Sequence, residues 1–196
     1  MDLKTLKSAV RNLCPEIDED DFSIFASHLK IVVLPKGAFF YREGEIHNEI
    51  AFISSGILRC FYWNDKGDFK NTRFIAENDY AVDYESLMDQ KPSQLNFVAL
   101  EDSSLVLISR ADFYNAAAVS KKWEKFARKM AEHVLRRTQK KLTSHLIKTP
   151  EQRYIDFIRE RPAMADRIPL YHLASYLGIE RESLSRIRKR ISKSRM

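Results

Sequence analysis

The sequence predicts an α+β protein with an N-terminal antiparallel β-roll (a double-stranded β-helix), a long connecting helix and a C-terminal helix-turn-helix domain. Three observations carry this prediction. Residues 31–109 contain short runs of β-branched and aromatic side chains separated by turn residues. Residues 121–147 keep a helical spacing of apolar side chains. Residues 170–189 have the spacing of a helix-turn-helix.

The roll is expected after a helical N-terminal segment, residues 2–30, which Pro15 divides into two amphipathic parts. No long helical pattern separates the strands that follow, which favours an antiparallel barrel or roll over a βαβ sheet. Four of the five glycines lie in the turns of this region. The predicted strands are residues 31–34, 38–41, 49–54, 57–63, 69–75, 95–99 and 104–109.

The long helix is predicted from Lys121 to Ile147, which gives a length of roughly 40 Å at 1.5 Å per residue. Its apolar stripe includes Phe126, Met130 and Val134, and much of the rest of its surface is charged. Such a helix either covers the roll or pairs with a second copy of itself. We expect it to be the dimerisation helix of a homodimer, and packing on its own domain is the alternative.

A new helix is predicted directly after the long one. Thr149 can cap it, Pro150 suits the first helical position, and Gln152 completes a capping box. Pro162 is expected to end this helix. These signals divide the chain into a sensor domain, a dimerisation helix and a helix-turn-helix domain, with the limits 1–120, 121–148 and 149–196.

Charge is distributed unevenly along the chain. Residues 1–120 carry 12 Lys and Arg against 19 Asp and Glu, whereas residues 121–196 carry 21 against 8. A basic last third of this kind predicts contact with a polyanion. No apolar stretch approaches the roughly 20 residues of a membrane span, and no signal peptide or CxxC pattern occurs. We therefore expect a cytoplasmic protein with reduced cysteines and no membrane partner.

The most specific pattern begins at Leu170. A helix-turn-helix needs a small fifth residue where its helices cross, and a glycine at position nine for a left-handed turn. It also needs apolar residues at positions fifteen and eighteen. Ala174, Gly178, Leu184 and Ile187 meet all four requirements.

The second helix of this motif, residues 180–191, is the predicted recognition helix. Arginine can donate two parallel hydrogen bonds to guanine, and glutamate can accept one from cytosine. A helix that presents such side chains near its N-terminus can read the major groove. The outward residues are Arg181, Glu182, Ser185, Arg186 and Lys189.

Residues 181–186 (Arg-Glu-Ser-Leu-Ser-Arg) resemble the recognition helix of the Crp/Fnr superfamily of bacterial transcription regulators. Residues 35–37, 43–44 and 53–59 are similar to the turns of that family's cyclic-nucleotide-binding β-roll. The resemblance implies a homodimer that reads a pseudo-palindromic operator in double-stranded DNA under control of a ligand in the roll. It also implies that Arg181, Glu182 and Arg186 read bases, that Ser183 contacts the backbone, and that an activator would contact RNA polymerase.

The sequence departs from this family at the effector site. Members that bind cyclic AMP hold it with a Gly-Glu pair and, about ten residues later, an Arg-Ser or Arg-Thr pair. Val82-Asp83 and Ser93-Gln94 stand at these places. A buried phosphate without its arginine loses a charge-assisted partner. The expected effector is therefore a small molecule other than cyclic AMP, in a pocket formed by Val82, Asp83, Ser93 and Gln94. The five residues after Ile191 leave no room for a wing, so we expect a reduced winged-helix domain.

Two other functional classes compete with a DNA-binding regulator. An enzyme is not expected, because the five histidines are scattered without metal-ligand spacing and no GxSxG, HExxH or P-loop pattern occurs. A ligand-sensing roll that acts through a protein partner is the stronger rival. A protein-docking helix should expose apolar anchors, whereas the recognition helix exposes arginines.

Overall fold

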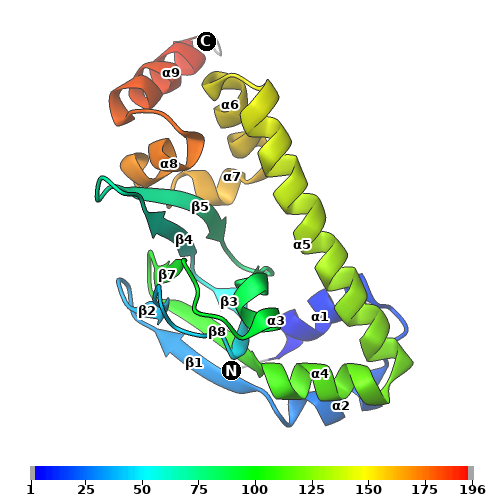
Figure 1. Ribbon diagram of the computed structural model, residues 1–196. Coiled ribbons are helices and arrows are strands. Elements are labelled where there is room, and N and C mark those ends of the chain that lie inside the picture. The colour runs from blue at the N-terminus through cyan, green and yellow to red at the C-terminus, as the bar shows by residue number, and fades with distance from the viewer. Residues whose placement is uncertain (1–2, 194–196) are drawn as a thin grey trace. The chain divides into compact units, whose positions relative to one another are not determined.

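The computed structural model describes residues 3–193. The chain forms two compact units. We call Met1–Cys60 with Phe74–Leu135 the roll unit, and Phe61–Arg73 with Arg136–Met196 the head unit. The order of elements is helices, strands, one long helix and then short helices, which confirms the predicted α+β class (Figure 1). The predicted domain limits at 120 and 148 stay a prediction.

Two short helices open the roll unit, as predicted. They are α1 (Lys4–Leu13) and α2 (Glu19–Ala26). Asp18 begins α2 with a capping box: its carboxylate accepts from the Asp21 amide at 2.9 Å, and the Asp21 carboxylate accepts from the Asp18 amide at 3.0 Å. These bonds satisfy two backbone donors that no helical carbonyl can reach.

Within residues 3–193, eight strands form two four-stranded sheets with the orders β1-β8-β3-β6 and β2-β7-β4-β5. All seven predicted strands are present, and β6 is an additional one of two residues. The side-by-side pairing of β3 with β8 places Ile50 opposite Ile108. The strands are β1 (Lys30–Leu34), β2 (Phe39–Tyr41), β3 (Glu49–Ser55), β4 (Leu58–Trp63), β5 (Phe69–Ile75), β6 (Tyr80–Ala81), β7 (Asn96–Ala99) and β8 (Ser103–Ser109).

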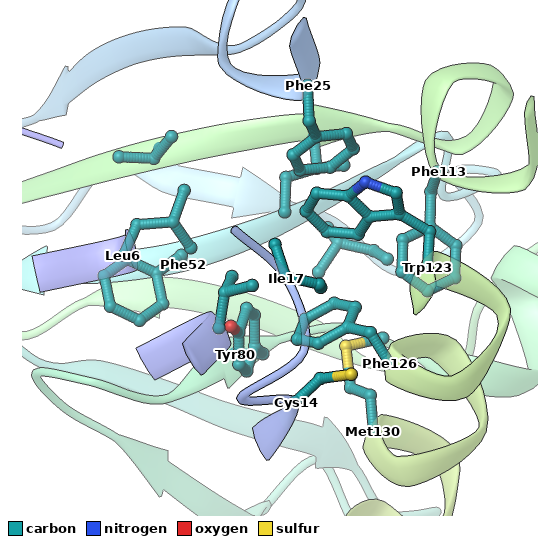
Figure 2. Close-up of a cluster of buried hydrophobic side chains, with 14 of the residues drawn as sticks. Leu6, Cys14, Ile17, Phe25, Phe52, Tyr80, Phe113, Trp123, Phe126 and Met130 are labelled. Carbon is teal, nitrogen blue, oxygen red and sulfur yellow. The ribbon is translucent and has the colours of Figure 1, made fainter. Parts of the chain in front are cut away.

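Side chains that alternate along these strands belong to two separate apolar clusters. One lies inside the roll and contains Cys60, Phe97 and Leu105. The other includes Cys14, Phe52 and Tyr80 together with side chains of the long helix (Figure 2). Neither cysteine forms a disulfide, and both are fully buried, one in each cluster.

Three helices follow or interrupt the strands: α3 (Tyr84–Asp89), α4 (Arg110–Val119) and α5 (Lys121–Ile147). The bounds of α5 agree with the prediction at both ends. Ser109 caps α4 by accepting from the Asp112 amide at 3.0 Å. The sequence analysis did not predict α3, which has only six residues.

The head unit contains α6 (Pro150–Glu160), α7 (Pro162–Ala165), α8 (Leu170–Leu177) and α9 (Arg181–Lys193). The capping box of α6 is formed as predicted, with Thr149 and Gln152 bonding each other's backbone. Pro162 was expected only to end a helix. It also begins α7, because proline suits the first helical position.

None of the helices within residues 3–193 is long and apolar enough to cross a membrane.

Candidate nucleic-acid interface and effector site

The turn between α8 and α9 has the geometry that the sequence predicts. Gly178 adopts a left-handed conformation with φ of 72°, which a residue with a Cβ rarely adopts. The Ile179 amide donates to the Ala174 carbonyl at 3.1 Å and so closes the end of α8. Ala174 and Leu184 are buried where the two helices meet. The turn therefore directs α9 away from α8 at a fixed angle.

Arg153 of α6 holds this turn in place. Its Nε and Nη2 donate to the Leu177 carbonyl at 3.2 and 2.7 Å, and its Nη1 donates to the Lys148 carbonyl at 2.6 Å. Partial burial lowers the pKa of the guanidinium from its usual range. Arg153 thus joins the end of α5 to the last carbonyl of α8, where a positive charge also favours the helix dipole.

The predicted base-reading side chains lie on an accessible surface of α9. Arg181, Glu182, Ser185, Arg186 and Lys189 are exposed, whereas Ser183 is half-buried. Arg186 donates to the Ser183 hydroxyl at 3.1 Å, so these two predicted contacts are joined within one turn.

A charged pair anchors the outer part of α9. Arg190 forms a bidentate ion pair with Glu151 of α6, with 3.1 Å between Nε and Oε1. Such a pair restrains the helix more than a single bond would. The arrangement leaves the first two turns of α9 open toward solvent while its later part is attached to α6.

The opposite side of the helix-turn-helix carries a contact that the sequence analysis missed. The start of β5, in the β4–β5 hairpin, lies against α8 within the head unit (Figure 1). The Asn71 amide donates to the Ser175 hydroxyl at 3.0 Å, and that hydroxyl donates to the Phe69 carbonyl at 3.2 Å. The Asn71 side chain donates to the His172 carbonyl at 2.9 Å. Asn71 and His172 are both buried. We call this set of contacts the hairpin clasp.

The structure brings together two of the four predicted effector residues. The Ser93 hydroxyl donates to the Asp83 carboxylate at 2.6 Å. Both backbone groups of Ser93 bond the loop that contains Gly44 and Glu45, at 2.8 and 2.9 Å. Val82 is buried in the apolar cluster that includes Tyr80, and Gln94 is exposed.

This arrangement does not suit a cyclic nucleotide phosphate. The half-buried Asp83 carboxylate would repel an anion beside Ser93. Within the described residues, no hydrogen bond or ion pair joins Asp83 or Ser93 to a lysine or arginine. A phosphate placed there would lose its water without gaining a cationic partner.

The predicted dimer residues differ in exposure. Phe126 and Met130 are 0% and 1% exposed, and they pack with Trp123 and Cys14 in a core of the roll unit (Figure 2). Val134 is half-buried. Leu142 and Leu146 are 61% and 76% exposed. Phe126 and Met130 are therefore core residues of the roll unit, and the predicted stripe joined residues that lie on two different faces of α5.

Comparison with known proteins agrees with this architecture. Residues 31–119 match the family described as cyclic nucleotide-binding domain. A search of curated protein sequences finds no match. Among solved structures, the chain is similar to FixK2 from Bradyrhizobium japonicum, with 19% identity over 85% of both chains and a TM-score of 0.76.

Two further solved structures share the fold. CLP, described as a c-di-GMP responsive global regulator of Xanthomonas campestris, has 13% identity over 90% of this chain and 93% of that chain, with a TM-score of 0.70. A crp/fnr-family regulator from Eubacterium rectale has 15% identity over 92% and 86%, with a TM-score of 0.69. Residues 31–119 thus match the cyclic nucleotide-binding domain family, and the chain shares the fold of solved structures that include a crp/fnr-family regulator.

Proposed function

We propose that this protein is a DNA-binding transcriptional regulator of the Crp/Fnr type, and not an enzyme. The observation that carries this proposal is the exposed first half of α9, which presents Arg181, Glu182, Ser185 and Arg186 beyond a left-handed Gly178 turn. A guanidinium group can donate two parallel hydrogen bonds and a carboxylate can accept one, so these side chains match the acceptors and donors on base edges in the major groove.

The residues of α9 divide into two roles in this proposal. Arg181, Glu182 and Arg186 read bases, and Ser185 lies among them on the same exposed surface. Ser183 and Lys189 contact the phosphate backbone, which positions the helix without carrying sequence information.

The regulator acts as a homodimer that pairs through α5. Leu135, Leu142 and Leu146 are exposed and lie seven and four residues apart, which is the spacing of a helix-pairing face. Two α9 helices related by a two-fold axis would read a pseudo-palindromic operator. If the protein is an activator, RNA polymerase is its further partner.

A small effector controls the dimer from the β-roll, and this effector is not cyclic AMP. The Asp83–Ser93 pair supports that assignment, because it offers a hydrogen-bonding site with negative charge. Ligands with hydroxyl, amide or ammonium groups suit this pair better than a phosphate does.

The decisive experiment is selection of duplex DNA by the purified protein, followed by anisotropy titrations of the selected sequence across salt concentrations. Recovery of a palindrome with half-sites about one helical turn apart would support dimeric readout. Arg186→Ala should then cost about 1–3 kcal/mol on that site and little on random DNA. Arg188→Ala is the matched control, because it removes an arginine of the same helix that is not among the proposed base-reading residues.

A dimer variant tests the pairing face. Leu142→Asp should shift the protein to monomer in sedimentation, whereas Thr143→Asp places the same charge on an exposed position of the same helix outside the row of leucines. An unchanged mass for Leu142→Asp would contradict pairing through this face.

The alternative is a sensor that acts through a protein partner. The apolar surface near α2 and α4, with Ile24 and Val119 exposed, is the observation that favours it. Selection that enriches no sequence, together with binding that vanishes as salt rises, would favour this alternative.

A further inference from the structure

A basic cavity lies inside the head unit, away from α9. It has a volume of about 550 Å³ between the last turns of α5, helix α6 and the end of α8. Nothing in the proposed reading of DNA by α9 uses it. Its charged lining consists of seven basic side chains, two carboxylates and one histidine: Arg136, Arg137, Lys140, Lys141, Lys148, Arg153, Arg161, Asp156, Glu160 and His145.

Helical spacing gathers these cations on one side of α5. Arg136 and Lys140 are four residues apart, so they share a face of the helix, and Lys148 follows directly after its last residue. The apolar residues Leu142 and Leu146 do not line the cavity. Pairing of two α5 helices through those leucines would therefore leave the cavity open.

The two carboxylates are already engaged with lysines. Lys148 contacts Asp156 at 2.5 Å, and Lys140 contacts Glu160 at 2.7 Å. These ion pairs link α5 to α6. The lining as a whole still carries a large positive excess, and a concave wall of one sign concentrates the electrostatic potential.

Arg153 adds a cation that no carboxylate neutralises among the described residues. Its three hydrogen bonds go to the Lys148 and Leu177 carbonyls. A half-buried guanidinium with only neutral partners favours an incoming anion, since charge-assisted bonds are the stronger ones.

An aromatic surface completes the cavity. Tyr176 and Phe157 line it with their ring centroids 5.7 Å apart. The Lys141 ammonium lies 4.8 Å from the centre of the Tyr176 ring. A base can stack on such a ring while its phosphates meet the cations.

We propose that this cavity binds a nucleoside polyphosphate as a second ligand of the regulator. The volume falls within the range of small-ligand sites, about 300–1,000 Å³. Duplex DNA suits it less well, because a stiff duplex is too wide to enter a cavity of this volume and cannot bend sharply into it. This site goes beyond the proposed readout of an operator by α9.

Calorimetric titration of the full-length protein without DNA tests the proposal. The probes are adenosine triphosphate, inorganic triphosphate and adenosine. We expect the nucleotide to bind best, inorganic triphosphate to bind more weakly, and adenosine to show no measurable binding. No heat from either phosphate compound at millimolar concentration would overturn the proposal.

Two double variants locate the binding. Arg136→Gln with Arg137→Gln should weaken nucleotide binding about tenfold or more. Lys125→Gln with Arg128→Gln removes the same charge from the same helix outside the cavity and should leave the affinity within about twofold. Circular dichroism checks that both variants are folded. Equal losses in both variants would reduce the binding to general polyanion attraction and overturn the site.

Tyr176→Leu tests the stacking surface. It should weaken binding of the nucleotide and leave that of inorganic triphosphate unchanged. A loss of DNA affinity in the cavity variant, with no nucleotide binding to the wild-type protein, would assign these cations to DNA phosphates instead. Arg186→Ala separates the two proposals, because it should impair operator binding and leave nucleotide binding intact.

Discussion

The roll unit and the head unit are stabilised by different kinds of contact. The roll unit is built around two clusters of fully buried apolar side chains, and Phe52, Phe97 and Phe126 are among the largest. In the head unit, side chains such as those of Arg153 and Asn71 bond backbone carbonyls and join segments that are distant in the sequence. When a side chain of an apolar cluster is truncated, the free energy of unfolding falls in proportion to the volume removed. When a single donor such as Arg153 is removed, all of its hydrogen bonds to the backbone are lost together.

The largest effect is expected from the core of the roll unit. Phe126→Ala should lower the free energy of unfolding by about 3–5 kcal/mol, because it leaves a cavity among Cys14, Trp123 and Met130. Lys121→Ala, at an exposed position of the same helix outside the row of leucines, should stay within about 0.5 kcal/mol. Urea denaturation of both variants measures the difference. A loss for Phe126→Ala no larger than that of Lys121→Ala would contradict the place of Phe126 in the core.

The second effect concerns the clamp on the helix-turn-helix. Arg153→Ala should cost about 1.5–3 kcal/mol, because it removes hydrogen bonds from a charged donor to the Leu177 and Lys148 carbonyls. Operator affinity should fall as well, since the angle of α9 depends on that turn. Arg159→Ala, an exposed arginine of the same helix, is the control. If both variants kept full stability and affinity, the clamp would have no role in holding the turn.

The hairpin clasp should respond more mildly. Asn71→Ala should cost about 1–3 kcal/mol, because it removes a buried hydrogen bond from the Asn71 side chain to the His172 carbonyl. Lys70→Ala on the exposed neighbour should have little effect. Hydrogen exchange of the α8 amides, measured by mass spectrometry, should rise only in the first variant. Unchanged protection of α8 would show that the hairpin does not support this helix.

The smallest effect is a dependence of the roll unit on pH. Two hydrogen bonds lower the pKa of Asp18 to about 2: the larger effect comes from the Asp21 amide and the smaller from the Lys122 ammonium. A carboxylate with a lowered pKa stabilises the folded state above its ordinary pKa, and this contribution is lost as the pH falls toward 2. Asp18→Asn should flatten the thermal midpoint against pH between about 4 and 2. Asp20→Asn, an exposed neighbour, should keep the slope of the wild-type protein.

Local patterns explain why most of the fold could be predicted. The strands of the roll have turn residues at both ends, and the α6 capping box needs only Thr149 and Gln152. The elements that were missed are short: β6 has two residues, α7 has four and α3 has six. Such segments are too short to show a periodicity, and they form because of the contacts that surround them.

The candidate site was likewise predicted where its pattern is local in the sequence and missed where its contacts are distant. The spacing from Ala174 to Ile187 lies within one segment, so it predicted the turn and the exposed surface of α9. The Arg153 clamp joins residues 24 positions apart, and the clasp between Asn71 and His172 spans 101. No local pattern reports contacts of that separation. The predicted stripe on α5 combined core and surface residues for a related reason, because helical spacing does not say what covers each face.

The two buried thiols have a practical consequence. Cys14 and Cys60 lie in different apolar clusters of the roll unit and are both closed to solvent. A thiol reagent can therefore modify each only when its own cluster opens, so the two labelling rates would report the opening of each layer separately. The same closure means that a cysteine introduced on the surface of α9 could carry a fluorophore while both native thiols stay in place.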